Sequence, residues 1–510
     1  MKKIMRRVLT IIPAVAVQGL WIYLLLKWLH PYTALITTIL SIFSFFFVLY
    51  VITRRDESTY KILWLLVILT FPLPGALLYL IFGNKRTARP LELSLARADM
   101  SCVPAAMAVS GPCEEIVPME GSARMEQTVR WLEKKTGCPL HRVESVKYYA
   151  LGDEMYPDML RDLKAAERFI YIEYFIIAPG LMWDSIAEIL EQKVKEGVDV
   201  RVMYDDLGSI ATFNIENRRQ LWEKGIKCVT FNPLVAVRGT CNYRDHRKML
   251  IIDGAAAYSG GVNLADEYIN RIEKHGHWKD VGFRLTGAPV RNYVRMFLQF
   301  WNAFSGQPVL QEPVLPDAPE PSPQAADGFV LSYCDSPLNK DATTNQLYAD
   351  LLSQATEYVW FFTPYLMLGD KLLDAIVSAA RRGVDVRILM PGIPDKKQIF
   401  RMSRSYYQVL LMEGVKIYEY TPGFLHAKGV VIDGRVCACG TVNLDYRSLF
   451  LHFENNSLFF DSSIVDAMKD DFLATQEKSR QIQPYDMNSH FLRRWIVDGV
   501  LRIFAPLCCK

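Results

Sequence analysis

The sequence has little net charge and lacks the residue patterns that mark several common protein classes. Lysine and arginine exceed aspartate and glutamate by only three (58 − 55), so no global charge indicates a nucleic-acid-binding protein. The ten cysteines are too few for a disulfide scaffold of 510 residues, and they show no paired CxxC spacing of the kind that binds zinc. Hydrophobic residues make up 51% of the chain, which excludes a largely disordered protein, and the length indicates about three domains.

Charged side chains are almost absent from the first part of the chain. Between residues 8 and 52 the only one is Lys27. Two apolar runs, 8–26 and 33–52, are each long enough to cross a hydrocarbon core of about 30 Å as a helix. A cleaved signal peptide is disfavoured, because the first run lacks a small-residue cleavage site and a second run follows it at once. We therefore expect residues 1–90 to form a helical membrane anchor.

A third apolar run, 62–82, differs from the first two because Pro72, Pro74 and Gly75 interrupt it. Proline removes a backbone donor and glycine loosens a helix, so this run can bend and return to the same face of the membrane. The alternative is a third crossing. We favour a re-entrant or interfacial segment, because basic residues occur on both sides of the run.

Basic clusters also predict the orientation of the anchor. They are Lys2, Lys3, Arg6 and Arg7, then Arg54, Arg55 and Lys61, then Lys85, Arg86 and Arg89. The turn between the first two runs contains only Lys27 and His30. The positive-inside rule places the first two clusters in the cytoplasm, so that the first two runs form a hairpin and the rest of the chain stays cytoplasmic.

The remaining sequence contains one unit twice. The tract Gly-Val-Asp-Val-Arg occurs at 197–201 and again at 383–387, and a Gly-[Ile/Val]-Lys tract occurs at 225–227 and at 414–416. In each copy a helical pattern, about 183–196 or 371–382, ends at the first of these glycines, where a left-handed cap is favoured. Helices alternating with β-branched runs predict an α/β layer structure with a largely parallel sheet.

The repeat gives the domain boundaries. We expect a first half at 120–305 and a second half at 329–485. Between them, residues 306–328 contain six prolines and form an extended linker. The tail, 490–510, mixes basic and apolar residues and can form an amphipathic helix, either at the lipid interface or packed against its own domain.

Each half contains one His-x-Lys motif, in a chain with only eight histidines. The motif residues are His246, Lys248, Asp253 and Asn263 in the first half, and His426, Lys428, Asp433 and Asn443 in the second. In both copies Lys, Asp and Asn follow His by two, seven and seventeen residues. Residues two apart on a strand face the same side, and Asp-Gly is a hairpin turn signal, so the returning strand brings Asn back towards His and Lys. The spacing therefore predicts an imidazole, an ammonium and an amide that converge twice.

This set of groups fits phosphodiester chemistry. Lys248, Lys428, Asn263 and Asn443 supply donors for the non-bridging oxygens without a metal. One neutral histidine can attack phosphorus while a second, protonated one donates to the leaving oxygen. No phosphate-binding glycine loop or metal-ligand cluster is recognisable, so we expect no metal and no cofactor.

Four carboxylates near the motifs are expected to have supporting roles. A catalytic histidine needs an orienting carboxylate, and Asp280 and Glu454, which follow His246 and His426 by 34 and 28 residues, are the candidates. Asp253 and Asp433 belong to the two motifs that we expect to be catalytic, but on the hairpin turns they are better placed to brace the turn than to touch substrate.

The paired HxKxxxxD motifs, each with a trailing G-[GT]-x-N, resemble the phospholipase D superfamily, and the chain most resembles bacterial cardiolipin synthases. Three further tracts have the same resemblance: Trp64–Gly83, Tyr204–Ser209 and Asn443–Ser448. One departure is Gly261, where the general pattern has serine and the second copy has Thr441.

This resemblance implies two phospholipase D-like α/β/α halves that share one active site behind a membrane anchor. It implies that two phosphatidylglycerol molecules give cardiolipin and glycerol, in a multi-pass protein of the bacterial cell membrane. His246 is then the nucleophile that forms a phosphatidyl-histidine, and His426 protonates the departing glycerol. The sequence itself is symmetric on this assignment, and it predicts no oligomeric state.

Other activities use the same histidines. A phospholipase D takes water as the acceptor and a phosphatidylserine synthase takes serine. A membrane-bound phosphodiesterase or nuclease needs a basic, aromatic-rich groove, which the net charge of +3 does not support.

Overall fold

The computed structural model describes residues 19–20, 23, 27, 32–54, 56–83, 89–106, 123–233, 242–311, 313, 315, 320–338, 342–487, 498–499 and 501–503. The chain forms two compact units, Met1–Arg89 with Gly499–Leu507, and Pro90–Asp498 with Cys508–Lys510. The predicted span 8–26 and the predicted tail 490–510 lie mostly outside the described residues.

The first unit contains the apolar helices α2 (Thr33–Ile52), α3 (Ser58–Thr70) and α4 (Pro72–Leu78), followed by a π-helical turn, Tyr79–Gly83. Among the described residues, one helix, Ala34–Ile52, is long and apolar enough to cross a membrane.

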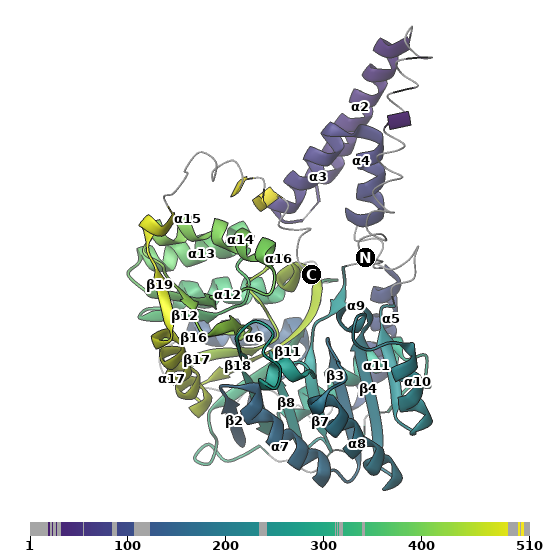
Figure 1. The fold of residues 1–510 in the computed structure, drawn as a ribbon, viewed down its shortest axis with the longest axis vertical. Coiled ribbons are helices and arrows are strands. Elements are labelled where there is room, and N and C mark those ends of the chain that lie inside the picture. The colour runs from purple at the N-terminus through teal and green to yellow at the C-terminus, as the bar shows by residue number, and fades with distance from the viewer. Residues whose placement is uncertain are drawn as a thin grey trace. The chain divides into compact units, whose positions relative to one another are not determined.

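The apolar run 62–82 bends at its middle. The backbone leaves the helical region at Phe71, and Pro72 starts a new helix at a position where proline is well tolerated. Helix α4 then lies beside α3 (Figure 1), so close that a Cβ on Gly75 would lie 2.5 Å from the carbonyl oxygen of Val67. A glycine is therefore required at this contact. The course of the bend relative to a membrane stays a prediction.

The second unit is built on two sheets with the same strand order. The first sheet runs β2 (Ser145–Tyr149), β10 (Gly282–Thr286), β8 (Ala256–Gly260), β7 (Lys248–Ile252), β3 (Phe169–Tyr174), β4 (Asp199–Asp205) and β5 (Lys227–Phe231). The second runs β11 (Phe329–Asp335), β18 (His452–Phe460), β17 (Val436–Gly440), β16 (Gly429–Ile432), β12 (Tyr358–Phe362), β13 (Asp385–Pro391) and β14 (Lys416–Tyr420), with β1 (His141–Arg142) and β19 (Ser479–Ile482) at its edges. The sequence repeat is therefore a repeat of topology.

Helices cover these sheets and fix the repeat locally. Helix α8 (Leu181–Lys195) leads to Gly197 and α13 (Asp370–Arg381) leads to Gly383, and these two glycines have φ values of 91° and 92°. Both helices thus end in the left-handed conformation that the glycines predict. Other helices of the halves are α7 (Gly152–Ala165), α10 (Ile215–Glu223), α11 (Val290–Phe304), α12 (Thr343–Gln354) and α17 (Ser463–Glu477), and Figure 1 shows α7, α8 and α10 along the first sheet.

The expectation of a largely parallel sheet is wrong. In the first sheet only the β3–β4 and β4–β5 pairs are parallel, and the pairs that join β2, β10, β8, β7 and β3 are antiparallel. The second half repeats this arrangement. The short Asp-Gly turn after each His-x-Lys strand explains the β7–β8 and β16–β17 pairs, because strands joined by so short a turn can only be antiparallel.

The two halves interlock through short strands. β6 (Arg244–Asp245) of the first half pairs with β18, and β9 (His277–Lys279) pairs with β15 (Gly423–Leu425) of the second half. Helix α6 (Ala123–Thr136) and β1 lie at the start of the predicted first half, yet Thr128 accepts a hydrogen bond from Gln354 of α12, and β1 pairs with β11 of the second sheet. The halves therefore form one compact unit.

Candidate active site

The hairpin turns of the two motifs hold their aspartates away from the histidines. Asp253 and Gly254 have φ values of 55° and 67°, and Asp433 and Gly434 have values of 49° and 66°, so both turns use the left-handed region at both central positions. His246 lies just before β7 and Asp253 just after it. The two aspartates thus lie at the far ends of their strands.

Each turn aspartate braces the start of a neighbouring strand. Asp253 accepts hydrogen bonds from the backbone N–H groups of residues 167, 168 and 169, all at 2.8 Å. Asp433 accepts the equivalent three from residues 356, 357 and 358. This geometry matches the bracing role expected for both residues.

We expect Asp253→Ala to destabilise the protein by about 2–3 kcal/mol, because three backbone donors lose a charged acceptor. The melting temperature of the solubilised protein should fall, while turnover per folded molecule stays near normal. Asp253→Asn tolerates the positive φ and keeps one oxygen, so its loss should be smaller. A collapse of turnover in a folded Asp253→Ala protein would contradict the bracing role.

The orienting carboxylates reach the histidines across the two halves. His246 Nδ1 lies 2.9 Å from Glu454, and His426 Nδ1 lies 2.5 Å from Asp280. All four side chains are buried, and both carboxylates are fully inaccessible. The sequence analysis named Asp280 and Glu454 as candidates but associated each with the histidine of its own half, whereas the structure places each beside the histidine of the other half.

Each histidine contacts the carboxylate of the other half because of the short strands that join the halves. In the β6–β18 pair Asp245 lies opposite Phe453, and the His246 N–H donates to the Phe453 carbonyl at 2.9 Å. The next residues along the two strands, His246 and Glu454, are therefore neighbours. In the same way, the β9–β15 pair makes Asp280 and His426 neighbours. The His426 N–H donates to the Lys279 carbonyl at 2.7 Å.

The two carboxylates have different surroundings. Glu454 also accepts hydrogen bonds from Thr441 (2.5 Å) and from the Ser448 hydroxyl. Asp280 accepts one from the backbone N–H of Val281, and Gly261 stands where the second half has Thr441. A Cβ on Gly261 would lie 2.0 Å from Asp280 Oδ1. The glycine that departs from the family pattern is thus required by the position of Asp280.

These surroundings shift the acidities of the site. Burial raises the pKa of Asp280 to about 6, although the nearby Lys428 opposes the shift. Burial raises the pKa of Glu454 to about 8, against the opposing effect of Lys248. Burial lowers the pKa of Lys428 to about 8, which Asp280 partly offsets. Asp280, beside His426, is therefore a stronger acid than Glu454, beside His246.

The motif lysines lie beside their own histidines. Lys248 Nζ donates to the His246 carbonyl at 2.6 Å, and Lys428 Nζ donates to the His426 carbonyl and lies 2.6 Å from His426 Nδ1. Both lysines are buried, and Lys428 is 4.0 Å from Asp280. Positive charge is thus fixed next to each imidazole.

The two motif asparagines are not equivalent. Asn263 accepts from the Ile176 N–H at 3.0 Å and donates to the Tyr268 hydroxyl at 2.8 Å. Asn443 donates to Asp445 at 3.1 Å and lines a cavity together with both histidines. Contact of either asparagine with a phosphate stays a prediction, and the position of Asn443 favours it more.

One cavity brings the two motifs together. Its lining residues are Phe175, His246, Tyr365, Lys396, Ile399, His426, Asn443, Asp445, Arg447 and His452. Because each motif histidine uses Nδ1 for its carboxylate, Nε2 is the nitrogen left for chemistry at both. The single site shared by two halves is thus formed by side chains from both.

Sequence reasoning did not name five polar residues of this lining as site residues: Tyr365, Lys396, Asp445, Arg447 and His452. His452 lies two residues before Glu454 on β18, and this spacing could have indicated a shared face. Its ring centroid is 5.8 Å from that of His246. Lys396 lies in a loop before α14 (Lys397–Ser405), and no spacing pattern indicates it.

Among the described residues, His246, His452 and Glu454 form the group most suited to hold a metal, with ligand atoms within 4.8 Å of one another. Glu454, however, already accepts hydrogen bonds from Thr441 and Ser448 and faces His246 Nδ1. A metal ion would have to replace these contacts, so the cluster fits proton handling better.

We expect turnover to fall as the pH rises above about 8, because Lys428 then loses its ammonium charge, whereas an ordinary lysine keeps it to about 10.5. In Lys428→Arg the guanidinium stays charged, so the alkaline limb of the pH–rate profile should move upward even if turnover is lower. An alkaline limb that stays in place in this variant would contradict the assignment to Lys428.

Comparison with known proteins agrees with this geometry. A family model described as "Cardiolipin synthase, PLD-like domain" matches residues 159–275 and 348–475, one segment in each half. A model described as "Phospholipase_D-nuclease N-terminal" matches residues 39–84, within the apolar N-terminal part.

Near full-length relatives give the same family. A cardiolipin synthase of Alkalihalophilus pseudofirmus is 33% identical over 464 residues, which covers 89% of this chain and 90% of that protein. Cardiolipin synthase 2 of Bacillus cereus is 33% identical over 468 residues, covering 90% and 88%. The crystal structure of a phosphatidylserine synthase from Haemophilus influenzae matches 74% of this chain and all of that chain with a TM-score of 0.56, and at 15% identity it shows the fold alone. The chain belongs to the cardiolipin synthase family of phospholipase D-like proteins.

Proposed function

We propose that this protein is a cardiolipin synthase that transfers a phosphatidyl group from one phosphatidylglycerol to a second, giving cardiolipin and glycerol. The observation that carries the proposal is the single cavity lined by His246 and His426, each held by a carboxylate of the other half. Two histidines with fixed tautomers on one cavity fit a two-step displacement at phosphorus. The names of the relatives agree with this reaction.

In the first step, His246 Nε2 attacks the phosphorus of the donor lipid. A P–N bond forms, the bond from phosphorus to the glycerol oxygen breaks, and protonated His426 gives its proton to that oxygen. The products are a phosphatidyl-histidine at residue 246 and free glycerol.

In the second step, a terminal hydroxyl of the second phosphatidylglycerol attacks the same phosphorus. His426, now neutral, takes the hydroxyl proton, a P–O bond forms and the P–N bond breaks. Cardiolipin leaves and both histidines return to their starting states. The exchange of one phosphodiester for another needs no external energy source.

The acidities of the two carboxylates support this division of roles. With a pKa of about 6, Asp280 is mostly ionised at neutral pH and favours a protonated His426, as a general acid requires. Glu454 has the higher pKa and shares its charge with Thr441 and Ser448, so it favours a positive charge on His246 less than Asp280 does on His426. As an acceptor it holds the His246 proton on Nδ1, which leaves Nε2 to attack phosphorus.

Fixed positive charge stabilises the phosphoryl oxygens in both steps. Lys248 and Lys428 lie buried beside the two histidines, where charge acts strongly because water is excluded. Asn443, which lines the cavity, adds an amide donor. These residues act equally on both displacements, since the phosphorus stays in place while its partners change.

The enzyme works at the membrane that contains its substrate. We infer that the apolar helix Ala34–Ile52 anchors it as part of a multi-pass arrangement in the cell membrane, with the catalytic halves in the cytoplasm. The basic clusters beside the apolar runs support this orientation. A reporter enzyme fused after residue 90 should be active only inside the cell. Activity only outside would contradict this orientation.

The reaction is tested by incubating the purified full chain with phosphatidylglycerol labelled in its terminal glycerol and in its phosphate, with and without EDTA. Cardiolipin and free glycerol in equal amounts are expected under both conditions. Phosphatidic acid as the main product would identify a phospholipase D instead. Phosphatidylserine formed only when serine is added would identify a phosphatidylserine synthase.

A further inference from the structure

The cavity has positive side chains that the paired motifs do not supply. Besides the histidines, its lining contains two cationic residues, Lys396 and Arg447, and both come from the second half. The donor phosphate, at His246 and His426, already has Lys248 and Lys428 beside it. The chemistry of the paired motifs therefore does not explain why Lys396 and Arg447 also lie at this cavity.

The two halves differ where Arg447 lies. The tract after the second motif asparagine is Asn443-Leu444-Asp445-Tyr446-Arg447-Ser448, and the first half has Asn263-Leu264-Ala265-Asp266-Glu267-Tyr268. Arg447 thus stands where the first half has an acidic residue, Glu267, which pairs with Lys274. The two halves have the same His-x-Lys residues, which act in both steps of the reaction. They differ at the position of Arg447 and Glu267. Such an asymmetry can distinguish the two lipid substrates.

Arg447 is held in place at the start of a short helix, α16 (Tyr446–Phe450). Asp445 caps this helix by accepting from the N–H groups of Arg447 (2.8 Å) and Ser448 (2.9 Å), so its charge is partly balanced. The Arg447 guanidinium also donates to Asn242 at 3.3 Å. A positioned guanidinium beside a reaction cavity suits a phosphate, which it can bind through two donors.

Lys396 approaches the same cavity from the loop that precedes α14. Its ammonium lies 3.0 Å from Asp395 and 5.7 Å from the centre of the Tyr365 ring, which also lines the cavity. The side chain is 37% exposed, so it can follow a lipid headgroup that enters from the surface. Lys396 and Arg447 thus provide one partly exposed and one buried cation.

The acceptor lipid requires such a site. When its terminal hydroxyl attacks the phosphorus on His246, its own phosphate lies one glycerol unit away and must share the cavity. Two phosphate anions at this separation repel each other strongly where water is excluded. We propose that Lys396 and Arg447 bind the phosphate of the acceptor phospholipid, an inference that rests on the proposed cardiolipin synthase reaction.

This site would select the acceptor. Water has no phosphate, so Lys396 and Arg447 do not help to bind it as an acceptor. They do help to bind an anionic phospholipid. Loss of the two cations should therefore slow transfer to phosphatidylglycerol more than the competing hydrolysis of the phosphatidyl-histidine. The measurable sign is the ratio of cardiolipin to phosphatidic acid.

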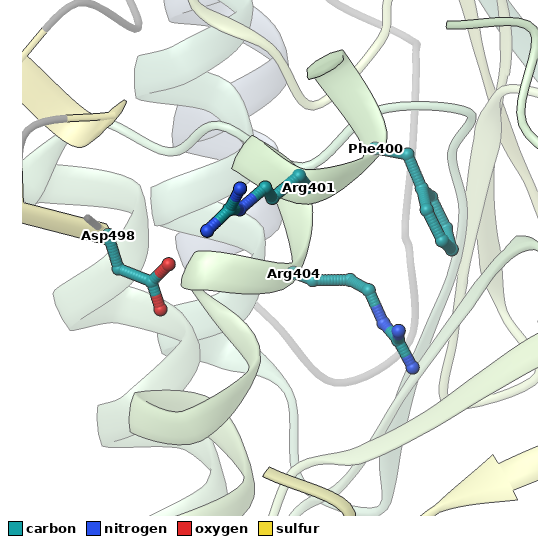
Figure 2. A pocket seen from close by; sticks show the side chains of 4 residues that line it. All are labelled: Phe400, Arg401, Arg404 and Asp498. Carbon is teal, nitrogen blue, oxygen red and sulfur yellow. The ribbon is translucent and has the colours of Figure 1, made fainter. Parts of the chain in front are cut away.

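The test compares Lys396→Gln, Arg447→Gln and Arg447→Lys in the full-length protein on vesicles of labelled phosphatidylglycerol. The matched control is Arg401→Gln, because Arg401 lies on α14, near Lys396 in sequence, but lines a separate depression. Figure 2 shows Arg401 facing Asp498 there, with Phe400 and Arg404 as the other lining residues.

We expect the cardiolipin to phosphatidic acid ratio to fall about tenfold or more in Arg447→Gln, as for loss of a charge-assisted hydrogen bond, and severalfold in Lys396→Gln. Arg447→Lys should recover part of the ratio, and Arg401→Gln should leave it unchanged. Lys396→Gln keeps the test decisive if buried Arg447 proves necessary for folding. Unchanged ratios in both glutamine variants would overturn the acceptor site. A wild-type enzyme that makes only phosphatidic acid would instead overturn the proposed function.

Discussion

His246→Ala should lower cardiolipin formation by roughly 10⁴-fold or more, because no covalent intermediate can form without the nucleophile. His426→Ala should lower it by about 10²–10⁴-fold, the usual contribution of a positioned acid and base. Both variants should still insert into membranes and melt cooperatively, since each exchange removes a cavity-lining ring and leaves the sheets intact. Product analysis on phosphatidylglycerol vesicles measures the loss.

A substrate with an activated leaving group separates the two roles. When a phosphatidyl group is attached to a good leaving group such as a nitrophenolate, departure needs no proton. His426→Ala should then release the leaving group in a rapid first turnover, and His246→Ala should not. Near-normal cardiolipin formation by either variant would contradict a site shared by the two halves.

Glu454→Gln and Asp280→Asn should each reduce turnover by about 10²–10⁴-fold, as expected when a buried carboxylate that fixes a histidine tautomer is replaced by an amide. The crossed contacts predict which step each variant affects. Glu454→Gln disturbs His246 and therefore the attack on phosphorus, although Glu454 lies in the second half. Asp280→Asn disturbs His426 and therefore proton transfer.

The activated substrate tests this crossing directly. Asp280→Asn should be rescued in the first turnover, because protonation of the leaving group is no longer needed, and Glu454→Gln should not be rescued. The opposite pattern would show that each carboxylate serves the histidine of its own half. Melting temperatures of both variants are needed as a control, because Glu454 also accepts from Thr441 and Ser448.

The sequence predicts much of this site because its spacings are those of local structure. The Asp-Gly turn after each His-x-Lys strand fixes a hairpin, and Asp253 and Asp433 brace it as their position indicates. The repeated Gly-Val-Asp-Val-Arg tracts mark equivalent strands, β4 and β13, in two sheets of the same order. A duplicated local pattern therefore predicts a duplicated fold.

The crossed pairing could not be predicted, because it depends on contacts between the halves. The strands that create it, β6, β9 and β15, have only two or three residues each and show no periodicity in sequence. Asp280 and Glu454 follow their own motifs closely, which favoured the wrong partner for each. Lys396 and Arg447 both belong to the second half, and they were missed because only the folded chain brings their segments to the cavity.

We propose that the phosphatidyl group is transferred in two steps through His246. The most direct test mixes the wild-type enzyme with phosphatidylglycerol labelled at phosphorus, stops the reaction within the first turnover and maps the label by peptide sequencing. We expect an acid-labile, base-stable phosphoramidate on the peptide that contains His246, and we expect the label to disappear when unlabelled phosphatidylglycerol is added. Label on His426, or no labelled protein while cardiolipin forms at full rate, would contradict it.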